Sequence, residues 1–524
     1  MLSRLENGLE RLERRKWLLL LLFLILYFAG FCLLAAKDVT FIDELFTIYI
    51  TRLPTLRDVW NALATGAEQT PPLIYLVTRA DFALLGRSLL AVRLPEMLGF
   101  AVMSVCLYHF VSKRSSALYG LVAMLFPLMT TAFKFVVRAR AYALVLGFSA
   151  LALVCWQWAA EDRHRKLALA GLGVSLAAAV SSHYYAVLSL FPLGLGEVVR
   201  SIRRKKVDVG VWLALVLSLS PLLLFLPLIE SARKFAPHFW SKPHWSSMAY
   251  FYQHFLLSPS PIPLLAILLV VAFYVVFFRP NAGGTESRAR SNTPLHEWAA
   301  VAGFLLMPLV GIVLAKTVVG AYEDRCALAA VIGLSIAVAL GLYSALDTKL
   351  TPAFGLALLL CSFLVVKQVQ TYRREVVYHA NQESVYALLE ANTGDSLPIL
   401  ISNPGAFVVF GYNAPKKIAR RFLYVADPEL ALHYSGTDDI EQGVVEMKSW
   451  AGMNVQSFPK FVASGQECYI YAVNYPDRYD WIIKALRAAH WEITLVSWQN
   501  DNIIFLARPG GRGRVPAGPI SQVK

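Results

Sequence analysis

Charged residues and cysteines are scarce in this chain, and each shortage restricts the kind of protein it can be. Only 16% of its 524 residues are charged, whereas 57% are hydrophobic and the mean hydropathy is +0.52. This composition is too apolar for a soluble protein and is typical of a protein that crosses a membrane several times. Of the six cysteines, only Cys468 lies in a polar region, so no disulfide framework is possible there.

Metal-ligand spacings and internal repeats are also missing. Without a CxxC motif or a Cys/His spacing, we predict no obligatory metal and no other cofactor, although carboxylates in outer loops leave a divalent ion open. The absence of repeated, paired broken helices argues against a transporter. The formal charge of +14 falls in short clusters between apolar runs, a distribution that orients membrane proteins, so we predict no nucleic-acid partner.

Apolar runs of spanning length fill the first two thirds of the chain. Residues 17–36 form an uncharged run that can cross a hydrocarbon core of about 30 Å, and its length favours a retained anchor over a cleaved signal peptide. Further spans, giving about eleven in total, are expected at residues 94–111, 116–133, 141–160, 167–182, 184–199, 209–229, 261–278, 298–315, 326–346 and 350–367.

The basic clusters alternate from loop to loop and set an orientation. They fall on the side of the N-terminal RLERRK, so residues 1–16 are predicted to be cytoplasmic. An odd number of spans then places the C-terminal region outside the cytoplasm. The stretch 167–199 is too long for one span and short for two, so it requires a tight turn at residues 181–185, around His183.

After residue 370 the composition changes to that of a water-soluble domain. No spanning run follows, and short β-rich segments alternate with helix-like ones, which predicts an α/β domain over residues 371–510 and a disordered tail over residues 511–524. Strands are expected at residues 397–402, 422–426, 468–473, 492–498 and 503–507, with a helix at 477–490 and a hairpin turn at 499–502. We expect this domain to act on the acceptor side or on stability.

The long outer loop at residues 37–95 carries the candidate chemistry. Asp43 and Glu44 are adjacent carboxylates shortly after the first span, and several cations lie in the other outer segments. A carboxylate base that activates a nucleophile, beside cations that hold a phosphate leaving group, fits this pattern. Alternatively, Asp43 caps a helix that begins at Glu44 or Leu45, with Glu44 in its first turn.

Three segments of this loop together resemble a known family. FIDELFTIYITR, EQTPPLIYL and AVRLPEMLG are similar, in this order, to the first outer loop of GT-C superfamily membrane glycosyltransferases, in particular bacterial relatives of protein O-mannosyltransferases and of the lipid A aminoarabinose transferase. RAYAL, which begins at Arg140, and SHYY at residues 182–185 are similar to two further segments of the family. The resemblance covers roughly residues 17–345 and does not extend to the C-terminal domain.

The resemblance implies a GT-C-like polytopic helical fold in a bacterial cytoplasmic membrane. It also implies that the donor is a sugar attached to a membrane lipid, a polyprenyl phosphate. Asp43 is then the catalytic base, Glu44 a supporting residue, and transfer proceeds with inversion. The donor phosphate is expected to contact Lys134, Arg138, Arg140 and Arg325. The substrate cavity is expected to include Pro71, Pro72, Tyr75, Arg93, Tyr142, His183 and Tyr184.

This sequence departs from the family at two places, and other interpretations stay open. Arg138 stands where many relatives carry an acidic residue, and YEDRC replaces a common Arg-Tyr pair. The two prolines can simply end a helix, Arg93 can reach to the headgroups, and His183 can be a hydrogen-bonded turn residue. A flippase or transporter of a lipid-linked saccharide and a non-catalytic assembly or sensor protein are the alternative functions. The sugar and the acceptor, whether protein, lipid or glycan, stay open.

Overall fold

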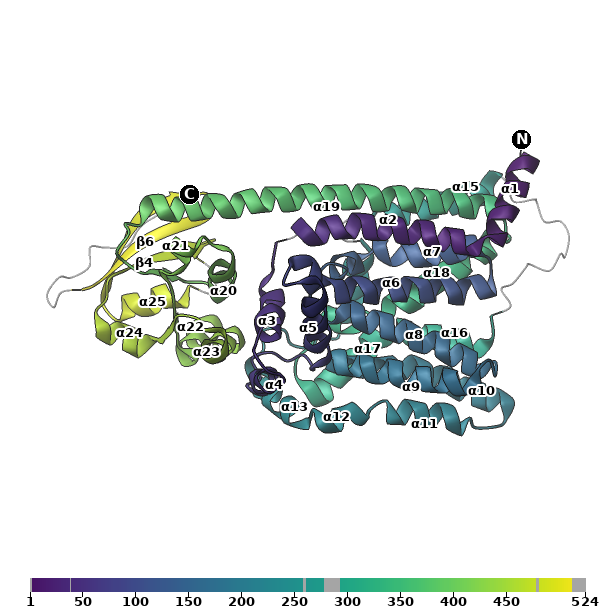
Figure 1. Ribbon diagram of the computed structural model, residues 1–524, viewed down its shortest axis with the longest axis horizontal. Coiled ribbons are helices and arrows are strands. Elements are labelled where there is room, and N and C mark those ends of the chain that lie inside the picture. Colours follow the sequence, from purple (N-terminus) through teal and green to yellow (C-terminus); the bar gives the residue numbers. More distant parts are fainter. Residues whose placement is uncertain (1, 38, 258–260, 278–292, 477–479, 511–524) are drawn as a thin grey trace. The chain divides into compact units, whose positions relative to one another are not determined.

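The computed structural model describes residues 2–37, 39–257, 261–277, 293–476 and 480–510 (Figure 1). Its backbone contacts divide the chain into two compact units. The helical unit comprises Met1–Val39, Phe46–Ala236 and Ser241–Val376, and the C-terminal unit comprises Thr40–Leu45, Pro237–Trp240 and Val377–Lys524. The predicted class, a set of apolar helices followed by a small α/β domain, is confirmed.

The helices of the first part of the chain include those expected from the predicted spans, together with further helices outside them. They are α1 (Leu2–Arg14), α2 (Lys16–Lys37), α3 (Ile42–Thr51), α4 (Leu56–Ala64), α5 (Leu73–Leu85), α6 (Leu89–Arg114), α7 (Ala117–Met129), α8 (Tyr142–Ala160), α9 (Arg165–Ser182), α10 (Leu190–Arg204), α11 (Val209–Leu217), α12 (Ser220–Leu224), α13 (Leu226–Arg233), α14 (Ser247–Leu257), α15 (Ile262–Phe277), α16 (Leu295–Leu305), α17 (Met307–Leu314), α18 (Ala330–Ala345) and α19 (Leu350–Asn392). Each predicted span overlaps one of these helices or a bent pair, although α7 ends before the predicted residue 133 and residue 278 lies outside the described residues. Helix α19 continues through residue 370 without a break.

Not every one of these helices is long enough to cross a bilayer alone. Within the described ranges, five helices are long and apolar enough, namely Lys16–Lys37, Leu89–Arg114, Tyr142–Ala160, Tyr184–Arg204 and Leu350–Asn392, and two bent pairs raise the number to seven. Ala117–Met129, Ile262–Tyr274 and Ala330–Ala345 are shorter apolar helices. The chain is thus a multi-pass membrane protein whose spans are partly short or broken.

Two spans that the sequence predicted as continuous are bent. The chain turns by 66° between α12 and α13 and by 52° between α16 and α17. Pro227 and Pro308 lie in the first turns of α13 and α17. A proline inside a helical run removes one backbone N–H and its ring clashes with the preceding turn, so each bend has a local cause.

Helices α6 and α8 lie side by side (Figure 1), and two glycines allow their backbones to approach closely. A Cβ atom on Gly147 would lie 2.4 Å from the Gly99 oxygen, and one on Gly99 would lie 2.6 Å from the Ala143 oxygen. Only residues without a side chain fit there, as is common where membrane helices touch backbone to backbone. The start of α8 is therefore held tightly against α6.

The C-terminal unit is an α/β domain with one mixed sheet. Its elements are β1 (Ile399–Ile401), α20 (Pro404–Asn413), α21 (Lys416–Ala419), β2 (Phe422–Ala426), α22 (Pro428–Ser435), α23 (Asp439–Ala451), β3 (Val455–Ser457), α24 (Phe458–Ser464), β4 (Cys468–Val473), α25 (Trp481–Ala488), β5 (Trp491–Gln499) and β6 (Asn502–Pro509). The strand order is β3-β2-β1-β4-β6-β5, with the first four strands parallel and β5 and β6 forming an antiparallel hairpin.

The sequence predicted all of these strands except β3, which has only three residues. The predicted hairpin turn at residues 499–502 is confirmed by the pairing of β5 with β6. The predicted helix at residues 477–490 is found as α25, with residues 477–479 outside the described part of the chain. The predicted tail at residues 511–524 also lies outside it.

A buried carboxyl group makes the stability of this domain depend on pH. Glu441 is 3% exposed and accepts hydrogen bonds from the Tyr424 hydroxyl at 2.5 Å and the Asp427 N–H at 3.1 Å. Burial raises its pKa from 4.5 to about 7. The folded chain therefore binds more protons than the unfolded chain between these values, so the free energy of unfolding falls by about 3 kcal/mol as the pH rises through this window.

Replacing this carboxyl group should remove that dependence. We expect Glu441→Gln to flatten the slope of stability against pH between 5 and 7.5, because a neutral amide does not titrate. The slope is measured by unfolding the purified full chain with denaturant at several pH values, with hydrogen exchange in α23 as the readout. The exposed Glu429→Gln serves as the control and should keep the wild-type slope. A wild-type slope in Glu441→Gln would assign the dependence to another group.

Candidate active site

The adjacent carboxylates lie in the first turn of α3. Helix α3 begins at Ile42, so Asp43 is not the capping residue of a helix starting at Glu44 or Leu45, and that alternative is wrong in this detail. The Glu44 carboxylate accepts the Phe41 N–H at 3.0 Å and is 1% exposed, whereas Asp43 is half-buried. Both charges are favoured at a helix N-terminus, but Glu44 is the one that closes the turn.

One turn later, α3 is fixed to the segment that carries two of the predicted phosphate ligands. The Thr47 hydroxyl donates to the Ala139 oxygen at 2.8 Å, and Thr47 is 1% exposed. Ala139 stands between Arg138 and Arg140 in the chain. Residues four apart share a face of a helix, so Asp43 lies on the same side of α3 as Thr47, one turn before it.

A buried ion pair orients Arg140. Its Nη1 lies 2.6 Å from Glu68 Oε2, and the Thr70 hydroxyl donates to Glu68 Oε1 at 2.6 Å. Glu68 is 6% exposed. A guanidinium held by a buried carboxylate keeps its planar fork in one direction, which suits it to bind a second anion.

The two prolines prepare the start of α5 beside this pair. Pro71 is buried, and Pro72 is the N-cap residue of α5, with φ −66° and ψ −23°. Three residues later, Tyr75 is 1% exposed, and its hydroxyl has no hydrogen-bond partner among the described residues. Burial, followed by the charge of Glu68, raises the pKa of Tyr75, so the hydroxyl stays protonated and able to donate.

The RLPE sequence at the start of α6 holds the ends of two other helices. Arg93 is fully buried and its Nη1 donates to the Ala35 oxygen at the end of α2, at 2.8 Å, so it does not reach to the headgroups. Glu96, also fully buried, accepts the Ala143 and Leu144 N–H groups of α8 at 2.7 and 3.2 Å. Each charge meets the helix end of opposite partial charge, which is favourable in a low-dielectric setting. Arg93 thus links α6 to the end of α2, and its predicted place in the substrate cavity stays a prediction.

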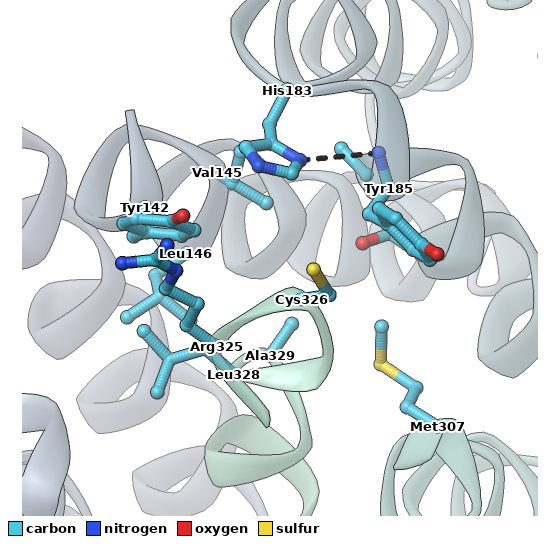
Figure 2. Close-up of a pocket in the computed structure, with 12 residues that line it drawn as sticks. Tyr142, Val145, Leu146, His183, Tyr185, Met307, Arg325, Cys326, Leu328 and Ala329 are labelled. Carbon is cyan, nitrogen blue, oxygen red and sulfur yellow. Dashed lines mark hydrogen bonds between the residues drawn. The ribbon is translucent and has the colours of Figure 1, made fainter. Parts of the chain in front are cut away.

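A small pocket forms where α8, the 3₁₀ turns η2 (Tyr184–Ser189) and η5 (Asp324–Ala327) and helix α17 meet, and Figure 2 shows its lining. The rings of Tyr142 and His183 are 5.2 Å apart, and the Arg325 guanidinium lies 5.7 Å from the centre of the Tyr142 ring. Arg325 Nε also pairs with Glu323 at 2.6 Å. The free space is about 10 Å³, close to what one water molecule needs, so a larger occupant requires side chains to move.

His183 occupies the predicted tight turn between α9 and η2. Its Nδ1 accepts the Tyr185 N–H at 3.2 Å, so the turn is confirmed and the ring is a hydrogen-bonded turn residue (Figure 2). Desolvation, followed by the charges of Arg140 and Arg325, lowers the pKa of His183, so the ring is neutral. Tyr184, at the start of η2, is half-buried and is not part of the lining of this pocket.

Lys134 lies in the 3₁₀ turn η1 (Thr131–Phe135) and not at the end of a span. Helix α7 ends at Met129, two residues after Pro127, instead of reaching residue 133, because proline weakens the helix there. The Lys134 ammonium is 5.0 Å from the Phe135 ring. Partial burial, followed by the charges of Arg138 and Arg325, lowers the pKa of Lys134, as expected for a group of like charges.

The structure thus joins the predicted residues through partners that the sequence did not single out. Glu68 is the most informative of these, and its signal in the sequence was an acidic residue three positions before two prolines, in the EQTPP segment. Across the described ranges, no group of three or more His, Cys, Asp or Glu side chains is arranged to hold a metal ion. The predicted lack of an obligatory metal stays a prediction.

Comparison with known proteins adds independent observations. Residues 69–229 match the family of dolichyl-phosphate-mannose-protein mannosyltransferases. No curated protein matches the chain in sequence. ArnT from Cupriavidus metallidurans in the apo state is similar in structure, with a TM-score of 0.52 at 12% identity, over 93% of this chain and 97% of that one. The same protein bound to undecaprenyl phosphate gives a TM-score of 0.54 at 13% identity, with the same coverage.

The chain has a GT-C fold. The resemblance inferred from the first-loop segments is therefore confirmed at the level of the fold, and the family match supports it over part of the chain. Within the GT-C fold, the matched residues include the segment from Pro71 to Tyr184. Asp43, Glu44 and Arg325 lie outside the matched residues, and the role of each predicted site residue stays a prediction.

Proposed function

We propose that this chain transfers a sugar from a polyprenyl-phosphate donor to an acceptor hydroxyl or amine at the outer face of the membrane. The observation that carries the proposal is the hydrogen bond from Thr47 to Ala139. It fixes α3, whose first turn carries Asp43, to the backbone between Arg138 and Arg140. A candidate base and candidate phosphate ligands are thereby tied to one segment.

The donor class follows from the basic residues and from the fold. Arg140 is oriented by Glu68, and Arg138, Arg325 and Lys134 lie close enough for their charges to interact. Several cations around one place suit a phosphate whose negative charge grows as the sugar leaves. The structurally similar ArnT has been solved with undecaprenyl phosphate bound, which supports a polyprenyl phosphate as the leaving group here.

The reaction is a single displacement. Asp43 accepts the proton of the acceptor nucleophile while the nucleophile attacks the anomeric carbon. The bond from that carbon to the phosphate oxygen breaks, and the polyprenyl phosphate leaves with the electron pair, its charge stabilised by the arginines. Attack from the side opposite the leaving group inverts the anomeric centre. Glu44, which closes the first turn of α3, supports the position of Asp43.

Transfer of label from a polyprenyl-phosphate sugar by the purified chain tests this function. Formation of a glycosylated acceptor with release of polyprenyl phosphate supports it. Movement of the intact lipid-linked sugar across vesicles without bond cleavage would instead identify a flippase. Binding of the donor with neither outcome would favour an assembly or sensor protein.

The orientation can be tested separately. We expect a reporter inserted at residues 394–395, in the exposed turn between α19 and β1, to report the outside of the cytoplasm. A reporter inserted after Arg204, at the end of α10, should report the cytoplasm, because the positive-inside rule places its basic cluster there. If both insertions report the cytoplasm, the outer-face reaction is wrong.

A further inference from the structure

The first turn of α3 packs with the C-terminal domain, although the two are far apart in the sequence. Thr40–Leu45 belongs to the same compact unit as Val377–Lys524. The Thr40 hydroxyl lies 3.2 Å from Asn413 Oδ1, to which it donates, and 3.0 Å from Asn413 Nδ2. Thr40 is 4% exposed and Asn413 is half-buried, so this contact is partly shielded from water and each lost hydrogen bond has a cost.

A second contact lies at the other end of α20. A Cβ atom on Gly405 would be 3.4 Å from Ile42 Cδ1 and 3.2 Å from Asn403 Oδ1. Ile42 thus lies within van der Waals reach of Gly405. Asn403 caps α20 by accepting the Ala406 N–H at 2.9 Å, so this end of the helix is well defined.

Helix α20 is itself held rigidly by the sheet. Val408 is fully buried, and the Phe407 and Tyr424 rings stack with their centres 5.4 Å apart. Phe410 packs on Tyr471 at 5.4 Å, so α20 contacts both β2 and β4. A segment that rests on both ends of α20 is therefore attached to the core of the domain.

We propose that α20 of the C-terminal domain sets the position of the Asp43–Glu44 pair, with Thr40, Asn413 and Gly405 as positioning residues. Asp43 directly follows Ile42, so a shift of this turn displaces its carboxylate. A misplacement of about 1 Å can reduce a rate about 100-fold. The inference rests on the proposed function, and it gives the C-terminal domain a role in the reaction beyond the acceptor side and stability.

The same domain also holds a second segment from the first part of the chain, Pro237–Trp240. The Thr437 hydroxyl donates to the His238 oxygen at 2.8 Å, and His238 Nδ1 lies 3.2 Å from Asp438, which is 6% exposed. This attachment is made at the start of α23 and not at α20. It provides a matched control, because Thr437→Val loosens a loop without altering the contacts of Thr40 or Ile42.

The contact between Thr40 and Asn413 can be broken from either side. We expect Thr40→Val and Asn413→Leu each to lower kcat about tenfold, with the KM for the donor unchanged, because one partly buried hydrogen-bonded contact is lost and the phosphate ligands are untouched. The double variant should be no slower than either single variant. Thr40→Ser, which keeps the hydroxyl, should retain the wild-type kcat, as should the exposed Lys416→Gln at the start of α21.

Hydrogen exchange tests the positioning without relying on activity. In Thr40→Val and Asn413→Leu, the amides of residues 40–45 should exchange at least tenfold faster than in the wild type, whereas Thr437→Val should leave them unchanged. Wild-type kcat with wild-type exchange in both variants would overturn the inference. If the wild-type chain transfers no sugar, the proposed function fails, and the exchange of residues 40–45 alone decides the inference. Should Asn413→Leu fail to fold, Thr40→Val decides it.

Discussion

Asp43→Asn should leave a folded chain that binds the donor and hardly transfers sugar, with a rate about 10²- to 10⁴-fold below that of the wild type. The amide keeps the size of the side chain and removes the proton acceptor. The fold should survive, because Asp43 is half-buried and the carboxylate that closes the first turn of α3 is that of Glu44. Single-turnover transfer and donor binding, measured on the same preparation, separate chemistry from binding.

Glu44→Gln is the matched control for this variant. Its side-chain oxygen can still accept the Phe41 N–H, so we expect a loss of less than about tenfold. Because adjacent helical residues point about 100° apart, the two carboxylates cannot serve one nucleophile equally. A near-normal rate in Asp43→Asn with a severe loss in Glu44→Gln would exchange their roles. Full activity in both variants would refute the mechanism.

Arg140→Gln should weaken binding of a polyprenyl phosphate about 10- to 100-fold, because it removes a charged partner of the phosphate. It also takes the guanidinium away from buried Glu68, which destabilises the fold, since a buried charge without its counter-ion costs about 3–5 kcal/mol. Binding measured by titration and unfolding measured by heating distinguish these two effects.

The double variant Glu68→Gln/Arg140→Gln makes the test decisive. It removes both charges of the pair and keeps the packing, so most of the stability should return while donor binding stays weak. Glu68→Gln alone keeps Arg140 and should bind the donor within about threefold of the wild type. If the double variant binds the donor like the wild type, Arg140 is only one half of a structural ion pair.

Elements with a local physical signal were predictable from the sequence. The apolar runs gave the helices of the membrane part, since about 20 apolar residues can span a bilayer without a partner. The turn around His183 followed from the length of the stretch that it divides, and the hairpin of β5 and β6 from its turn residues. In each case the deciding information lies within a few tens of residues.

Features that depend on distant contacts were not predictable in this way. The pairing of Glu68 with Arg140 joins positions 72 residues apart, and the contact of Thr40 with Asn413 joins positions 373 residues apart. Strand β3 has only three residues and pairs with β2, so its conformation comes from its neighbour more than from its own sequence. Pro227 and Pro308 were visible in the sequence, but the bends beside them were not predicted, because hydrophobicity alone does not separate a bent span from a straight one.

The RLPE sequence also has a consequence for how the chain is made. Arg93 bonds α2, which is already synthesised when α6 emerges from the ribosome, whereas Glu96 bonds Ala143 of α8, 47 residues further along. During this interval the carboxyl group enters the bilayer without its final partner, at a cost of about 2.5–3.5 kcal/mol near the centre of a membrane and less near its surface. We therefore expect α6 to be held less firmly at its final depth until α8 is inserted beside it.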